Sequence, residues 1–321
     1  MKLTDQAMAD VRLILTMLAV VAVPTLLTLA TVRVPVAEYA TTENPTPYGY
    51  TVSLLLFLVP VVTIGIHHLR HGHPFDKRAF VWCAALMAGL GAVLDFFFGY
   101  AFFEFPNEGA TLGIRVPAWS WSELGWVPSY LPIEEFGFYI FGALFMISVY
   151  LWADSDWLAK YDSDEYGQAA RTHPKIVEIS PRAFAVWVGL VAVGILYRYQ
   201  ADGGFPGYYV FLMGCGVLPS IFLIRTVKLF VNWHALAFAF GGLVLISIIW
   251  EATLGLPYQW WTYRSDQMLG VYLHAWGGLP LEEVTLWLVG VWDAVMFYEL
   301  FRISFRMDRS VRQRLFGLPE S

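Results

Sequence analysis

The sequence predicts an all-α integral membrane protein with about eight transmembrane helices, arranged as two parallel four-helix repeats. Three observations predict this fold class. Of the 321 residues, 58% are hydrophobic and only 14% are charged, whereas soluble domains contain roughly 25% charged residues. The apolar residues gather in runs that are long enough to span a bilayer, which takes about 20 residues. The Lys and Arg residues fall almost entirely on one side of those runs.

The predicted spans are apolar runs separated by polar segments. In chain order they cover residues 11–32, 50–69, 79–103, 131–153, 183–199, 207–226, 233–254 and 278–301. Pro24, Pro60 and Pro219 lie within spans and are expected to kink helices, because neighbouring helices can satisfy the freed backbone groups. The first run is longer than a signal-peptide core and lacks a clear small-residue cleavage site, so it is interpreted as a retained helix.

The distribution of positive charge predicts the orientation of the chain. With the N-terminus in the cytoplasm, only Arg33, Arg115, Arg198 and Arg264 of the 20 Lys and Arg residues fall outside. Because basic residues favour the cytoplasmic side, the sequence predicts a multi-pass protein of the cell membrane with both termini cytoplasmic. The net charge of −6 gives no support for nucleic-acid binding.

A charged segment divides the spans into two groups of four. Residues 1–153 form the first predicted repeat, 154–182 a cytoplasmic linker, and 183–321 the second repeat with a basic C-terminal tail. An even number of spans in each repeat keeps the two halves parallel, related by an axis along the membrane normal.

Corresponding motifs recur in the same order in both halves. The first half has Asp95 four residues before Gly99, Leu-Gly at 112–113, Ala-Trp at 118–119 and Leu-Pro-Ile-Glu-Glu at 131–135. The second half has Glu251 four residues before Gly255, Leu-Gly at 269–270, Ala-Trp at 275–276 and Leu-Pro-Leu-Glu-Glu at 279–283. The first half carries about nine extra residues before its glutamate pair.

Carboxyl groups at membrane depth are costly and usually functional. The candidate catalytic residues are therefore Glu134, Glu135, Glu282, Glu283, Asp95 and Glu251. Adjacent helical residues point about 100° apart, so one glutamate of each pair is expected to face a cavity while backbone donors at the helix start hold the other. Glu135 and Glu283 are the preferred acids, because desolvation lets a cavity-facing carboxyl keep its proton near neutral pH.

Two structural interpretations compete with the catalytic one. The glutamate pairs would cap helix N-termini at the membrane interface. Asp95 and Glu251 would be interfacial residues or would pair with a loop arginine such as Arg115 or Arg264. The histidine cluster at 67–73 is interpreted as a solvated cytoplasmic loop, and no metal site is predicted.

Aromatic residues follow or precede the candidate acids. An aromatic face stabilises a nearby cation by about 0.5–2 kcal/mol. The candidate cation-stabilising or substrate-binding residues are Phe96, Phe97, Phe98, Tyr139, Trp260, Trp261, Trp276 and Trp287. His274 precedes the second motif and is a candidate for orienting it. Aromatic belts at membrane interfaces are the alternative interpretation of these rings.

With its duplicated Pro-x-Glu-Glu motif, its upstream acids, and Trp260-Trp261 followed by Leu269-Gly270, the sequence resembles the membrane-embedded lycopene cyclases of the heterodimeric bacterial and fused archaeal and fungal type. The resemblance covers residues 50–153 and 205–301. It implies two tandem cyclase modules and a lycopene β-cyclase-like intramolecular lyase, an isomerase of carotenoid biosynthesis. Val284 and Thr285 stand where that family usually has an aromatic pair.

The resemblance implies ring closure at the end of a linear carotenoid without redox change. An acid protonates the terminal double bond, a second double bond attacks the resulting cation, and a base removes a ring proton. The expected partners are the hydrophobic polyene substrate, the lipid bilayer and other carotenoid biosynthesis enzymes.

No cofactor motif is identifiable, although a reduced flavin stays open because some soluble lycopene cyclases use one. Three other functions stay open: a proton-coupled transporter, a cyclase of another polyene or terpenoid, and a non-catalytic carotenoid- or lipid-binding subunit.

Overall fold

The computed structural model describes residues 46–72, 75–122, 125–161, 166–273 and 278–318. Within them the chain is mostly helical. In the described part of the chain, seven helices are long and apolar enough to cross a membrane: Gly49–His71, Lys77–Phe102, Ile133–Ser155, Pro181–Asp202, Gly207–Val227, Trp233–Gly255 and Leu281–Arg306. The protein is therefore a helical membrane protein.

These helices coincide with seven of the predicted spans, and the predicted span at 11–32 lies outside the described residues. The shortest prediction, 183–199, corresponds to α8 (Pro181–Asp202), which is longer because both ends are capped. The Ser180 hydroxyl accepts a hydrogen bond from the amide of Ala183, and Pro181 begins the helix. Gly203 ends it in the left-handed conformation with φ of 75°, which glycine adopts without strain.

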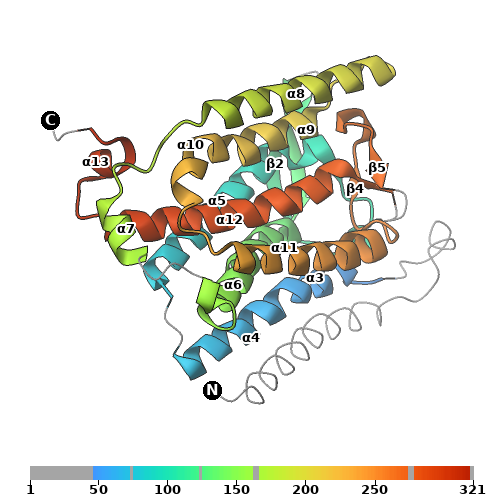
Figure 1. Ribbon diagram of the computed structural model, residues 1–321. Coiled ribbons are helices and arrows are strands. Elements are labelled where there is room, and N and C mark those ends of the chain that lie inside the picture. Colours follow the sequence, from blue (N-terminus) through green and yellow to red (C-terminus); the bar gives the residue numbers. More distant parts are fainter. Residues whose placement is uncertain (1–45, 73–74, 123–124, 162–165, 274–277, 319–321) are drawn as a thin grey trace.

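The remaining long helices are α4 (Leu55–His71), α5 (Lys77–Phe102), α6 (Ile133–Ser155), α11 (Trp233–Ser247) and α12 (Leu281–Arg306). The two helices that begin with the glutamate pairs lie at the centre of the bundle (Figure 1). Helix α6 packs against α4, α5 and α11, helix α12 packs against α5 and α11, and α6 and α12 contact each other. Helix α8 lies at one edge.

Two of the spans contain π-helical turns. The span at 207–227 consists of α9 (Gly207–Leu212), the π turn η3 (Met213–Val217) and α10 (Leu218–Val227). The π turn η4 (Ile248–Gly255) continues α11 and carries Glu251. Such turns are often found at functional sites.

Short strands lie at the end of the bundle where α6 and α12 begin, and the sequence had not predicted them. Strands β2 (Arg115–Ser122) and β3 (Gly125–Pro132) form an antiparallel hairpin, which contains the extra residues of the first half. The corresponding strands of the second half are only β5 (Tyr272–Leu273) and β6 (Leu279–Pro280). Strand β1 (Phe103–Glu104) pairs with β4 (Thr262–Tyr263), which joins the two halves.

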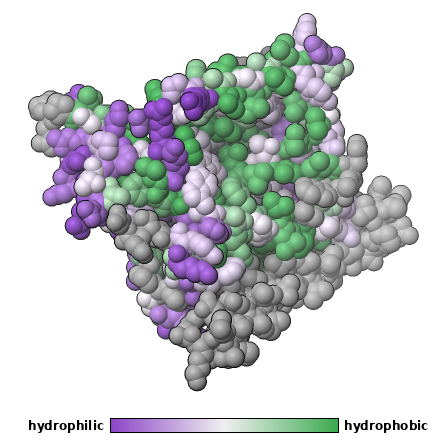
Figure 2. All heavy atoms as spheres, viewed as in Figure 1, coloured by the Kyte–Doolittle hydropathy of each residue, from purple (hydrophilic) through white to green (hydrophobic). Residues whose placement is uncertain are grey.

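Large apolar side chains are exposed along the outer helices. On α5 they include Val81, Trp82 and Val93, and on α8 Val186 and Val193. Figure 2 shows hydrophobic residues over the flank of the helices and hydrophilic residues at the end that carries α7 (Tyr166–Thr172) and α13 (Val311–Phe316). Exposed apolar surface of this extent marks contact with lipid.

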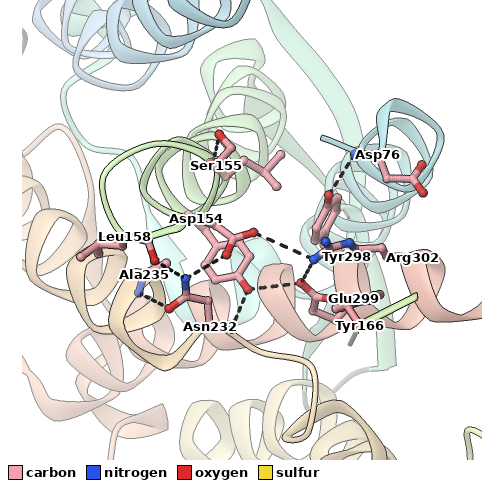
Figure 3. Close-up of polar contacts among 12 residues, drawn as sticks. Asp76, Asp154, Ser155, Leu158, Tyr166, Asn232, Ala235, Tyr298, Glu299 and Arg302 are labelled. Atoms are coloured by element: carbon pink, nitrogen blue, oxygen red, sulfur yellow. Dashed lines mark hydrogen bonds and ion pairs between the residues drawn. The ribbon is translucent and has the colours of Figure 1, made fainter. Parts of the chain in front are cut away.

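A polar cluster joins the halves at the end of the bundle opposite the strands (Figure 3). Fully buried Glu299 accepts hydrogen bonds from Tyr166 at 2.6 Å and from Tyr150 at 3.2 Å. The guanidinium of Arg302 lies 3.3 Å from Glu299 and 3.9 Å from Asp154. Since Tyr166 belongs to α7, the cluster attaches the predicted linker to α12.

Asn232 connects the same cluster to α11. Its side-chain amide donates to Asp154 at 3.0 Å, and its side-chain oxygen accepts from the amide of Ala235 at 3.2 Å. The second contact caps the start of the helix. The polar cluster is thus explained by packing of helices α6, α7, α11 and α12.

We predict that Arg302→Met lowers the free energy of unfolding by about 3–5 kcal/mol, because it leaves buried carboxylates without their cation. Arg306→Met is the matched control, since Arg306 contacts the Tyr166 ring at 4.9 Å and should cost less than about 1 kcal/mol. Thermal and denaturant unfolding in detergent measure both. Equal losses for the two variants would contradict this account of the cluster.

Candidate functional site

Three of the predicted acids line one small cavity at the end of the bundle near the strands. Glu135 of α6, Glu251 of η4 and Glu283 of α12 surround about 30 Å³, and we call this space the acid cavity. Asp95 of α5 lines an adjoining space, and the two spaces share the walls Phe138 and Tyr139. The fold therefore brings together acids that are up to 188 positions apart in the sequence (Asp95 and Glu283).

The first glutamate of each pair is held by a loop. Glu134 accepts hydrogen bonds from the amide of Leu112 at 2.7 Å and from the Thr51 hydroxyl at 2.5 Å. Glu282 accepts a hydrogen bond from the amide of Leu269. The second glutamate of each pair faces the acid cavity, as the 100° separation predicts. The loop donors are the Leu-Gly turns that the sequence analysis had aligned.

These two turns make the same backbone contacts. Gly113 and Gly270 follow the donor leucines with φ of 74° and 89°, a conformation that favours glycine. The amide of Ile133 donates to the carbonyl of Ile114 at 3.0 Å, and the amide of Leu281 donates to Val271 at 2.9 Å. Each turn thereby supports the start of its own helix.

Two tyrosines that the sequence analysis missed bind the cavity-facing glutamates. Tyr50 donates a hydrogen bond to Glu135, and Tyr208 donates to Glu283 at 2.7 Å. Both tyrosines are buried. One sequence pattern could have identified these tyrosines: a Gly-Tyr pair occurs at 49–50 and again at 207–208, and each pair begins a helix of its half.

The upstream acids receive donors from the helices of the glutamate pairs. The Tyr139 hydroxyl lies 3.5 Å from Asp95. Trp287 donates its ring N–H to Glu251, which also accepts from Tyr263 at 3.4 Å. Tyr139 and Trp287 each lie four residues after the cavity-facing glutamate of their half, so one helical turn places both donors.

The interpretation in which Asp95 and Glu251 pair with loop arginines is wrong for the described residues. Arg115 forms an ion pair with Glu108, and Arg264 lies 3.6 Å from Glu104.

No basic side chain lines the acid cavity or its neighbour within the described chain. The carboxyl groups are therefore stabilised by hydrogen bonds from phenol, indole and amide groups. Tyr263 lies outside the spans, and burial, followed by the nearby carboxylates of Glu251 and Glu283, raises its pKa well above the usual value. It therefore stays a protonated donor at neutral pH.

Aromatic rings form much of the cavity wall. Trp250, which the sequence analysis missed, packs 4.5 Å from Trp261 and 4.9 Å from Phe138 between ring centroids, and all three line the acid cavity. Trp260 stacks on Tyr50 with 6.4 Å between the ring centroids, and it lines neither the acid cavity nor the adjoining space. Thus Trp261 is a wall residue, whereas Trp260 supports Tyr50.

The three consecutive phenylalanines of α5 have different surroundings. Phe98 lines the adjoining space, whereas Phe96 and Phe97 line neither cavity and Phe97 is exposed. They point differently because successive helical positions are 100° apart. Trp276 and His274 lie outside the described residues.

The adjoining space is an apolar slot of about 150 Å³. One face of α5 lines it from Met87 to Phe102, which is about 22 Å along a helix. Faces of α6, α9, η3 and α12 form the other walls, and nearly all of these residues are apolar. Leu90 both lines the slot and is exposed on the flank of α5. The slot is therefore elongated and apolar, and it reaches the exposed flank of the bundle at Leu90.

The histidine cluster is separate from this site. His67 and His71 lie in the final turns of α4, and His68 is buried, so the prediction of a solvated loop is wrong there. Among the described residues, no group of three or more His, Cys, Asp and Glu side chains is placed to hold a metal ion.

No protein-family model, curated protein or solved structure matches this chain.

We predict that Glu282→Leu lowers the free energy of unfolding by about 1–3 kcal/mol, because the amide of Leu269 loses its acceptor in a buried place. Glu282→Gln keeps an acceptor oxygen and should lose less. Glu104→Gln, on an exposed ion pair, is the control and should stay within about 1 kcal/mol. Unfolding in detergent measures all three. An unchanged stability of Glu282→Leu would show that the turn does not depend on this carboxyl.

Proposed function

We propose that this protein is a carotenoid end-group cyclase, which closes a ring on a linear polyene inside the membrane by acid catalysis. The observation that carries the proposal is the acid cavity: Glu135 and Glu283, one from each half, face the same aromatic-walled space without a basic side chain among the described residues. The adjoining apolar slot supports a long hydrocarbon ligand, and the resemblance of the sequence to membrane lycopene cyclases agrees with it.

The proposed reaction needs a proton donor, a proton acceptor and exclusion of water. Glu135 or Glu283 gives its proton to the terminal double bond, and the resulting tertiary cation is attacked by a second double bond of the same chain. A neighbouring carboxylate then removes a ring proton, so the product is an isomer of the substrate and no redox partner is needed. Rings of Trp250, Trp261 and Phe138 face the cation.

Each neighbouring group has a distinct role in this proposal. Tyr50 and Tyr208 orient the two cavity-facing glutamates. Asp95 and Glu251 are the candidate bases, and Oδ2 of Asp95 has no hydrogen-bond partner within the described chain. Glu134 and Glu282 are positioning residues, since each binds a loop amide.

We further propose that the chain has eight spans in two parallel four-helix repeats. The matched contacts of the Leu-Gly turns and of the two Gly-Tyr pairs support this arrangement. With both termini in the cytoplasm, as the Lys and Arg distribution predicts, the acid cavity lies toward the outer side of the cell membrane. The polar cluster of Asp154, Glu299 and Arg302 then lies toward the cytoplasm.

We predict that Glu135→Gln and Glu283→Gln each lower ring formation by about 10²–10⁴-fold, because an amide cannot act as a general acid. Glu134→Gln and Glu282→Gln should retain more activity, because each keeps its acceptor for a loop amide. Pigment analysis after expression in a lycopene-accumulating bacterium measures the products. Full activity of all four variants would rule out the catalytic role of these glutamates.

A proton-coupled carrier is the second candidate, because η3 interrupts the span at 207–227 close to its middle, and broken helices often hold transported substrates. Unchanged lycopene in cells that contain folded protein, together with proton-driven uptake into proteoliposomes, would favour the carrier.

A further inference from the structure

Asp293 of α12 is a buried carboxyl that the proposed ring closure does not use. Its exposure is 7%, it lines the apolar slot, and its Oδ1 atom has no hydrogen-bond partner within the described chain. Most buried polar atoms in proteins do have partners, and an exception calls for an explanation. The other acids that face the two cavities receive donors from Tyr50, Tyr208, Tyr139 or Trp287.

Asp293 stands apart from the duplicated set of acids. It follows Glu283 by ten residues, which places it about 15 Å farther along α12. The residue ten positions after Glu135 is Phe145, which packs in the hydrophobic core. The equivalent position of the first half is thus apolar, so the packing that the two halves have in common does not require an acid at position 293.

Asp293 lies beside the π turn η3, and it lines the slot together with residues of that turn. A Cβ added to Gly216 would lie 3.8 Å from Oδ2 of Asp293 and only 2.4 Å from Val289, so the backbone of η3 comes close to the carboxyl and the Val289 side chain packs against Gly216. Pro219 follows η3 and cannot donate a backbone hydrogen bond to the preceding turn.

A ligand atom can supply the missing partner. A carboxyl group accepts hydrogen bonds, and in its neutral form it also donates one, so it can bind a hydroxyl or a carbonyl oxygen. The separation from Glu283 sets the length of such a ligand. At about 1.2 Å of reach per bond of an extended chain, 15 Å takes about a dozen bonds, or about three isoprene units.

We propose that the slot binds a linear isoprenoid that carries a hydroxyl or carbonyl oxygen about 15 Å from its reacting end, and that Asp293 forms a hydrogen bond with this oxygen. The inference rests on the proposed function only for placing the reacting end in the acid cavity. Asp293 is then a specificity-determining residue: it favours chains that carry an oxygen at this position over hydrocarbons of the same length.

Binding of matched probes to the purified full chain in detergent tests this selection. Tritium-labelled geranylgeraniol is displaced by unlabelled geranylgeraniol, or by the linear hydrocarbon of the same length without the oxygen. The wild-type protein should prefer the alcohol by about tenfold, which corresponds to one net hydrogen bond. Asp293→Leu should abolish that preference while still binding the hydrocarbon, and Asp293→Asn should keep part of it.

Val289→Ala is the matched control, since it widens the slot beside Asp293 without changing its polarity. It should change the affinity for both probes by the same factor. The inference is overturned if the wild-type protein shows no saturable binding of the alcohol, if it shows no preference, or if the preference survives in Asp293→Leu.

Ring formation in cells is a separate measurement. If the protein forms rings but shows no Asp293-dependent preference for the alcohol over the hydrocarbon, only the role of Asp293 is overturned. If that preference depends on Asp293 but no polyene is cyclised, the cyclase proposal is overturned and the binding site remains.

Discussion

The structure depends on keeping several carboxyl groups inside an apolar helical bundle, with no basic side chain of the described residues lining the space beside them. A carboxyl removed from water must be hydrogen-bonded or paired with a cation. Here tyrosine, tryptophan and loop amides provide the hydrogen bonds. Glu135, Glu283 and Glu251 each have at least one such donor. An arginine in the same place would hold the carboxyls as anions, whereas the proposed reaction needs at least one of them to carry a proton.

The same requirement explains the loops at that end of the bundle. Each Leu-Gly turn points an amide at the first glutamate of its half, and a glycine with positive φ follows the donor. The strand pair β1–β4 then brings the two halves into contact beside the acid cavity. The halves are not identical, because Tyr139 faces Asp95 in one and Trp287 faces Glu251 in the other. This difference supports unequal roles for the two halves in the proposed reaction.

The two ends of the bundle use buried charge differently. In the polar cluster, Arg302 neutralises Glu299 and Asp154, and the result is a packed junction of helices with the predicted linker. In the acid cavity there is space beside the carboxyls and an apolar slot that leads to it. Burial of an acid alone thus does not indicate a site; the absence of a nearby cation and the presence of a cavity distinguish the two.

The sequence by itself determined the spans in the described chain and the six acids, because runs of about 20 apolar residues have few other stable folds and charges among them are conspicuous. It also matched the Leu-Gly turn of one half with that of the other. Only the tertiary structure decided which side chains face the acid cavity. Tyr50 and Tyr208 are ordinary aromatic residues in apolar runs until chain packing places them against acids 85 and 75 residues away, and Trp250 is one until packing makes it a wall of the acid cavity. Of the short strands, only the pair β1–β4 joins distant segments, and it was equally hidden because no local pattern marks it.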